Sequence, residues 1–150
     1  MARAGASEDT IVAGILNDTM EDSVAEKKVT KEMIAERFGT RVADIVESVS
    51  QPNKELSWEE RKEEAYHHIA GMAHESLLVK SADLISNISD MITDHRAEGD
   101  DTFSRFNAPL EKIIAHYMRM IDAIGKKWPG NPLNEDLQSL KVAPMFARML

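Results

Sequence analysis

Apolar residues recur with helical spacing along most of the chain, and no stretch alternates as a strand would. Val42, Ile45, Val46 and Val49 follow the i, i+3, i+4, i+7 spacing of an amphipathic helix. A longer stripe, ending at Gly125, consists of Leu110, Ile113, Ile114, Tyr117, Met120, Ile121 and Ile124. A shorter one, after a turn-rich linker, consists of Leu133, Leu137 and Leu140. The pattern therefore predicts an all-α protein.

The N-terminal half predicts further helices. Residues 9–16 are apolar nearly all round, which is typical of a central, buried helix. A short helix capped by Thr30 should turn Ile34 and Phe38 inward. Ser57 and Glu60 have the spacing of a capping box, so another helix should begin there.

Two later stretches predict breaks between helices. A mostly apolar helix containing residues 77–88 should reach Met91, and the charged residues 94–101 should form a loop. Asn107 followed by Pro109 is typical of the start of a helix.

Composition narrows the class of protein. A chain of 150 residues with 43% hydrophobic residues is long enough for one globular domain. The net charge of −8 argues against nucleic acid as a partner. No apolar run approaches the roughly 20 residues of a membrane span, and the first residues do not resemble a signal peptide. We therefore expect a soluble, cytoplasmic protein. There is no cysteine.

Three carboxylates follow the first apolar run. Asp18, Glu21 and Asp22 sit at i, i+3 and i+4, so a continuous helix would place them on one face. Such a cluster is a candidate for cation binding or acid–base chemistry. The alternative is a solvated helix end.

A second candidate lies on the helix containing residues 77–88. Asp83 and Asn87 are four residues apart and share a face, with apolar residues on either side. An aspartate in such surroundings is costly to bury unless it is paired or binds a metal. The alternative is an aspartate that bonds a local group.

These stretches belong to an ordered set of motifs. The set comprises residues 13–23 (AGILNDTMEDS), residues 30–50 (TKEMIAERFGTRVADIVESVS), Lys54, residues 60–62 (ERK) and residues 80–88 (KSADLISNI). Their order and separation resemble the HD-domain phosphohydrolases, over about residues 9–125. Within that family the resemblance is closest to the hydrolase domain of RelA/SpoT-type enzymes and to small stand-alone hydrolases of the alarmone (p)ppGpp. Residues 126–150 match no family motif and form a C-terminal extension of unknown role in a single domain over 1–150.

The resemblance implies a fold and a chemistry. The fold is an all-α, HD-domain-like helical bundle. The family holds one divalent metal, usually manganese, which activates a water against the 3′-pyrophosphate. Carried over by position, Asp18 and Asp83 are metal ligands, and Glu21 and Asp22 are the catalytic acidic pair. Residues implied to contact the substrate are Asn87, Lys54 and Arg61.

Three departures from the family pattern concern the site. Asn17 stands where the motif has histidine, and an amide lacks the nitrogen lone pair that suits manganese. The family's early histidine has no counterpart, since only seven residues precede the matched helix. Leu84 replaces a residue that is usually basic. If the acids at 18, 21, 22 and 83 converge, we expect their repulsion to raise at least one carboxylate pKa.

Two hypotheses on function follow. The first is a (p)ppGpp-type pyrophosphohydrolase with an incomplete metal site, and therefore weak or inactive. The second is a non-catalytic, nucleotide-binding or oligomeric helical module on the same scaffold. The apolar residues of the first helix, Ile11, Val12, Ile15 and Leu16, would pack against leading helices in the family. We therefore expect a homo-oligomer that covers them. The alternative is that the sequence is a fragment or a start-site truncation of a longer enzyme.

Overall fold

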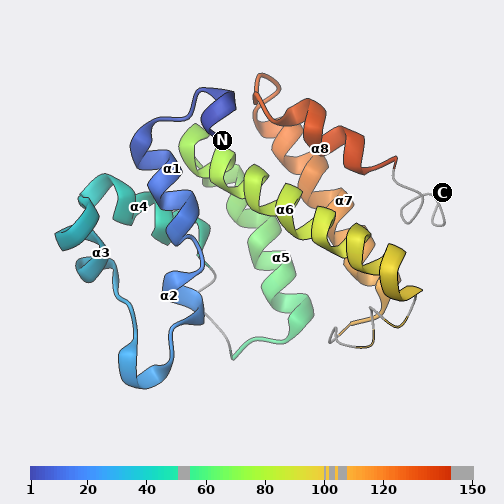
Figure 1. The fold of residues 1–150 in the computed structure, drawn as a ribbon, viewed down its shortest axis with the longest axis horizontal. Helices are drawn as coiled ribbons and strands as arrows, with labels where there is room; N and C mark the ends of the chain where they lie inside the picture. The colour runs from blue at the N-terminus through green and yellow to red at the C-terminus, as the bar shows by residue number, and fades with distance from the viewer. Residues whose placement is uncertain (51–54, 100, 102–103, 105–107, 143–150) are drawn as a thin grey trace.

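The computed structural model describes residues 1–50, 55–99, 101, 104 and 108–142, and these residues form helices and no strand (Figure 1). The predicted all-α class is confirmed. The α-helices are α1 (Glu8–Leu16), α2 (Thr19–Asp22), α3 (Lys31–Phe38), α4 (Thr40–Val49), α5 (Trp58–His68), α6 (His74–Glu98), α7 (Leu110–Lys127) and α8 (Asn134–Leu140). Short 3₁₀ turns lie at Ala2–Ala4, Ala25–Lys27 and Ile69–Gly71.

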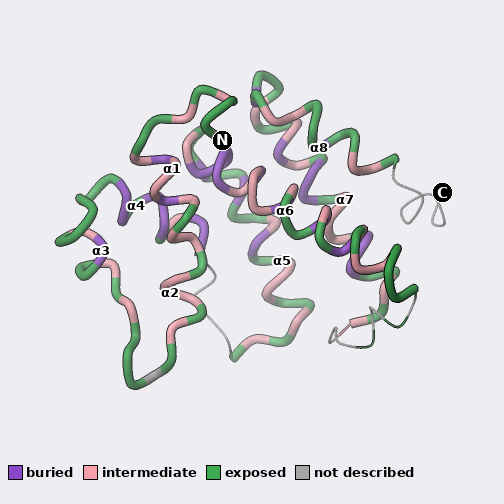
Figure 2. Tube along the Cα trace, viewed as in Figure 1, coloured by how far each residue is buried: buried purple, intermediate pink, exposed green. Residues whose placement is uncertain are grey.

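Helix α6 is the longest element and crosses the middle of the molecule (Figure 1). It packs against α1 and α4 on one side and against α7 and α8 on the other. Buried residues of α6 pack on both of these sides. Val79 belongs to one hydrophobic cluster, and Leu77, Leu84 and Ile88 belong to a second one. Figure 2 shows the resulting buried positions along the central helices.

Two hydrophobic clusters hold the bundle together. The N-terminal cluster consists of Ala13, Ile34, Val42, Ala43, Ile45, Val46, Val49 and Val79. The C-terminal cluster consists of Ala65, Ile69, Met72, Leu77, Leu84, Ile88, Met91, Ile113, Ile114, Met120, Ile121, Ile124 and Leu137. The stripes predicted on α4, α7 and α8 supply much of both clusters, so that part of the sequence analysis is confirmed.

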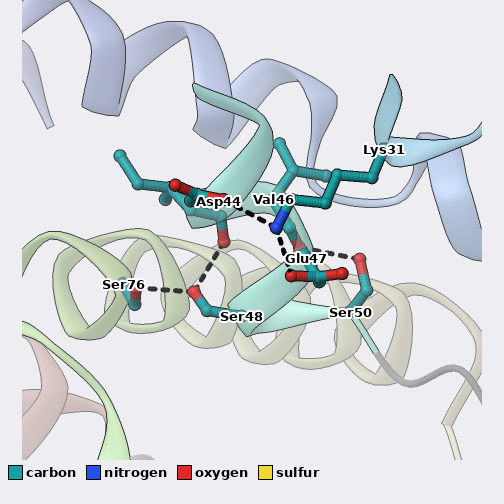
Figure 3. A network of polar contacts seen from close by, with 8 residues as sticks. Lys31, Asp44, Val46, Glu47, Ser48, Ser50 and Ser76 are labelled. Atoms are coloured by element: carbon teal, nitrogen blue, oxygen red, sulfur yellow. Dashed lines mark hydrogen bonds and ion pairs between the residues drawn. The ribbon is translucent and has the colours of Figure 1, made fainter. Parts of the chain in front are cut away.

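Polar contacts tie α4 to its neighbours (Figure 3). The Lys31 ammonium lies 2.7 Å from both Asp44 and Glu47, which joins the start of α3 to α4. On another side of α4, the Ser48 hydroxyl bonds the buried Ser76 at 2.6 Å, which joins α4 to α6. Helix α4 is thereby held between α3 and α6.

Helix starts follow the predicted caps. The Thr30 hydroxyl accepts the Met33 N–H, and Ser57 with Glu60 forms a complete capping box. The predicted cap at Asn107 lies outside the described residues, and α7 begins at Leu110.

Several predictions about burial and length are wrong. Ile15 is 75% exposed, so the first helix is not buried all round, and Phe38 is 47% exposed. Because α1 packs on α4 and α6 alone among its main contacts, its outer face stays open to solvent. The predicted loop from residue 94 begins later, since α6 continues to Glu98 and ends at Gly99, whose φ is 66°.

The segment after α7 packs onto the bundle. Leu137 is fully buried, and the buried Asn131 amide donates to the Ser81 hydroxyl at 2.8 Å. Asn131 also accepts the Leu133 N–H, which fixes the turn before α8. Among the described residues, none of the helices combines the length and apolar character needed to cross a membrane.

Candidate functional site

The predicted acids meet in a pocket of about 200 Å³ between two walls. One wall is the chain between α1 and α2, and the other is the middle of α6. Lys62 of α5 also faces the pocket. The lining residues are Asn17, Asp18, Glu21, Asp22, Val49, Lys62, Val79, Lys80, Asp83 and Asn87. The structure thus brings together all four acids that the sequence analysis selected, with both of its amides.

The wall between α1 and α2 is not a continuous helix, which corrects the prediction. Helix α1 ends at Leu16, whose carbonyl accepts the Thr19 hydroxyl at 2.7 Å. Helix α2 begins at Thr19, and the N–H groups of Glu21 and Asp22 donate to the Asp18 carbonyl at 3.1 and 2.8 Å. This one turn keeps the three carboxylates close to the pocket despite the break.

Side chains on the α6 wall form hydrogen bonds with one another. Asp83 Oδ2 accepts Lys80 Nζ at 3.0 Å, and Asp83 Oδ1 accepts Asn87 Nδ2 at 2.9 Å. Asn17 Nδ2 approaches the same Oδ1 at 3.5 Å from the opposite wall. Of the two interpretations left open for Asp83, local bonding is therefore present in this structure, while its carboxylate also faces the pocket.

The acids affect one another electrostatically. Partial burial raises the pKa of Asp18, and the charges of Asp83, Asp22 and Glu21 raise it further, while Lys80 opposes them. Burial also lowers the pKa of Lys62, with Lys80 and Arg61 acting in the same direction. Repulsion thus raises one carboxylate pKa, as the sequence analysis expects of converging acids.

The predicted substrate-binding cations are only partly located. Lys54 lies outside the described residues. Arg61 does not line the pocket, and its buried Nε has no hydrogen-bond partner within the described part of the chain. Lys62 lines the pocket instead. The spacing from Trp58 through Lys62 to Ala65 places Lys62 on the inward face of α5, so helical periodicity could have found it.

Helix α7 brings two further titratable groups towards this region. Burial, together with Lys62, Lys80 and Arg119, lowers the pKa of His116 to about 4. Burial and the Asp83 charge raise the pKa of Tyr117. The sequence analysis assigned Tyr117 to the apolar stripe alone, because helical spacing does not reveal that a carboxylate of another helix lies nearby.

A larger open cavity of about 560 Å³ lies near the start of α6, away from the predicted acids. Its Arg41 side chain is paired with Glu75 at 2.5 Å, and Ser48 is bonded to Ser76. These polar groups are therefore engaged with one another. The acidic pocket remains the candidate site because it gathers the residues of the family motifs.

The divalent metal implied by the resemblance does not fit this arrangement of donors. Both Asp83 oxygens already accept hydrogen bonds, and Lys80 holds an ammonium group where a cation would bind. Asn17 presents its N–H₂ group to Asp83, and an amide nitrogen is no metal ligand. The part of the chain that the structure describes contains no group of three or more His, Cys, Asp or Glu residues arranged to hold a metal.

Comparison with known proteins points to one family. The family model described as "HD domain" matches residues 1–111. Over 94 residues the chain is 33% identical to a guanosine-3′,5′-bis(diphosphate) 3′-pyrophosphohydrolase of Aquifex aeolicus, a match that covers 61% of this chain and 13% of the relative. The pyrophosphohydrolase MESH1 of Danio rerio is 35% identical over 83 residues, or 55% of this chain and 43% of the relative.

Other relatives extend the match further along the chain. A GTP pyrophosphokinase of Myxococcus xanthus is 32% identical over 145 residues, which cover 91% of this chain and 18% of that protein. The crystal structure of lmo0812 from Listeria monocytogenes superposes with a TM-score of 0.80 at 28% identity, covering 93% of this chain and 89% of that one. The chain spans less than half the length of these curated relatives. The match to the family model over most of the chain confirms the resemblance seen in the motifs: the chain belongs to the HD domain family.

Proposed function

We propose that this chain is an HD-family nucleotide pyrophosphohydrolase-like protein for a (p)ppGpp-type guanine nucleotide, with an incomplete metal site and weak or absent turnover. Two relatives named as guanosine-3′,5′-bis(diphosphate) 3′-pyrophosphohydrolases support the substrate class. We infer low turnover from the contacts of Asp83, because its carboxylate is already bonded to Lys80, Asn87 and Asn17 and is not free to bind a metal. HD domains generally depend on a divalent metal, and manganese is the metal that the resemblance suggests.

The pocket contains the groups that hydrolysis would need besides a metal. In the proposed reaction a water attacks the phosphorus bound to the ribose 3′-oxygen, and the bond between that phosphorus and the ribose oxygen breaks. Pyrophosphate is released, and the ribose oxygen takes up a proton from solvent to become a hydroxyl. Glu21 and Asp22 would orient the water and accept its proton, because ionised carboxylates are general bases. Asn87 would face the nucleotide, with Lys54 and Arg61 as further contacts. Asp18 and Asp83 stand at the positions of the family's metal ligands, but Asp83 is already bonded to Lys80 and to the two amides.

A second candidate function is nucleotide binding without catalysis. Asn17 favours it, because the amide that replaces the family's histidine is bonded to Asp83 and offers no nitrogen ligand. The two candidates differ in turnover, while both predict binding of the nucleotide.

One experiment separates them. The purified chain would be titrated with (p)ppGpp by calorimetry, and release of pyrophosphate would be followed with chelator or with added manganese. Binding with slow, manganese-stimulated release that is lost in Glu21→Gln supports the first candidate. Binding without release supports the second, and no binding in either condition contradicts both. Glu36→Gln, on the exposed surface of α3, is the matched control.

We also propose that the chain forms a homo-oligomer through the outer face of α1, where Ile15 is 75% exposed. Because Ile15 is exposed in the single chain, Ile15→Asp should leave the fold intact and reduce the oligomer to monomers. Light scattering coupled to gel filtration measures the mass, and circular dichroism checks the fold. A parent protein that is monomeric at micromolar concentration contradicts this proposal.

A further inference from the structure

The ion pair of Lys80 and Asp83 differs from the others in the molecule. Its two side chains are only 17% and 16% exposed, at an N–O distance of 3.0 Å. In each of the other ion pairs found among the described residues, at least one side chain is 50% or more exposed. Solvent therefore screens the other pairs far more than it screens this one.

The ammonium group of Lys80 lies at a carboxylate of the acidic pocket. Four carboxylates and two lysines line the pocket, and Lys80 is the lysine within ion-pair distance of a pocket carboxylate among the described residues. Lys62 faces the same pocket, where the charges of Glu21 and Asp83 act on it. An acid cluster without a nearby cation would oppose folding.

From these contacts we infer that Lys80 is the resident cation of the acidic pocket and takes the place that a divalent metal would have at Asp83. The ammonium group donates to Asp83 Oδ2, while the two amides occupy Oδ1. A metal could bind this carboxylate directly only after displacing one of these partners. The inference does not depend on the proposed function, since it concerns what neutralises the acids whether or not a nucleotide is hydrolysed.

The test removes the charge and keeps the apolar stem. Lys80→Met should lower the melting temperature in chelator by roughly 3–8 °C, because Asp83 is left without its cation. Manganese chloride should then restore the melting temperature of Lys80→Met, and its affinity by calorimetry should rise at least about tenfold over the parent. The parent should melt at the same temperature in chelator and in manganese. Lys112→Met, which breaks the exposed pair with Glu59, is the matched control and should change neither property.

A double variant separates charge from packing. Lys80→Met combined with Asp83→Asn removes both charges and should recover most of the stability lost in Lys80→Met alone. If the double variant fails to fold or recovers nothing, the lysine acts through its stem and the inference is wrong. A parent that binds manganese tightly, with no gain in Lys80→Met, overturns it as well.

Discussion

The two clusters on either side of α6 are built from different side chains. The N-terminal cluster buries alanine, valine and isoleucine, chiefly from the short helices α1, α3 and α4. The C-terminal cluster buries mainly isoleucine, leucine and methionine, chiefly from the long helices α6 and α7. Larger side chains remove more apolar area from water, so the C-terminal half should be the more stable of the two. Among the described residues, the exposed large apolar side chains of the N-terminal half are Ile15, Val24, Met33 and Phe38, and Val142 is exposed after α8.

The two walls of the acidic pocket also differ in how firmly they are packed and bonded. On α6, which is anchored in both clusters, Asp83 is bonded to its neighbours. On the other wall, the Asp18 carboxylate forms no hydrogen bond or ion pair within the described residues, and α2 has a single turn. The comparison predicts that the carboxylate on the well-packed helix contributes to stability, whereas the one on the less anchored wall opposes folding.

The largest expected effect comes from matched truncations in the two clusters. Ile121→Ala should cost about 3–5 kcal/mol of unfolding free energy, because Ile121 is fully buried between long helices. Ile34→Ala should cost nearer about 2 kcal/mol, since α3 packs chiefly on α4 and can relax around the cavity. Urea unfolding monitored by circular dichroism measures both.

Hydrogen exchange provides the control for that comparison. Ile34→Ala should speed amide exchange in α3 while leaving α7 protected, whereas Ile121→Ala should speed exchange throughout. An equal or larger loss of stability in Ile34→Ala would show that the two halves do not differ as proposed.

Periodicity predicted the buried residues of the long helices. It failed on the short helices, where contacts with neighbouring elements decide which face is buried. The stripe on α7 has seven positions in phase, so its buried face could be read directly from the sequence. Ile15 and Phe38 have suitable spacing as well, but which face of a short helix is covered depends on neighbours that spacing does not reveal. The end of α6 was missed because residues 94–98 are mostly charged or polar, and such residues alone do not stop a helix.

The second prediction concerns the bonded wall. Asp83→Asn should cost about 1–3 kcal/mol at pH 7 in chelator, because the substitution leaves the Lys80 ammonium group without its carboxylate. Thermal and urea unfolding measure the loss. Asp122→Asn removes the partner of Lys141, but Asp122 is 62% exposed, so this control should change stability by less than about 0.5 kcal/mol. Equal effects of the two substitutions would argue against a special role of the α6 pair.

The motifs predicted which residues meet at the site better than they predicted the contacts there. Asp83 and Asn87 share a face by spacing, and the structure confirms that they adjoin the acids near residue 18. Whether Asp83 takes a metal or a lysine could not be decided from the pattern, because Lys80 stands at i−3 in either case. The contacts of Asn17 could not be predicted from the pattern either, because the orientation of its side-chain amide depends on the position of Asp83.

A smaller effect is expected from His116, which adjoins the pocket lysines. Its pKa of about 4 in the folded chain lies below its usual value, so on acidification the unfolded chain takes up a proton that the folded chain refuses. Stability should therefore fall by about 1 kcal/mol as the pH decreases from 7 to 5.5. His116→Gln should flatten this dependence, whereas the exposed control His68→Gln should keep it. An unchanged slope in His116→Gln contradicts the assignment.

The smallest effect, and the one with the opposite sign, is expected for Asp18→Asn. Burial and three neighbouring acids raise the pKa of Asp18, so the folded chain disfavours its charged form and the charge opposes folding at pH 7. Asp18→Asn should therefore stabilise the protein in chelator, by less than about 1 kcal/mol because the residue is largely exposed. The gain should shrink as the pH falls through the raised pKa, since the parent's carboxyl group is then neutral as well. Urea unfolding at pH 7 and pH 4 measures it, with the exposed Asp90→Asn on α6 as a control that should show no gain. If Asp18→Asn is instead less stable than the parent at pH 7, the carboxylate has a structural role and the two walls do not differ in sign.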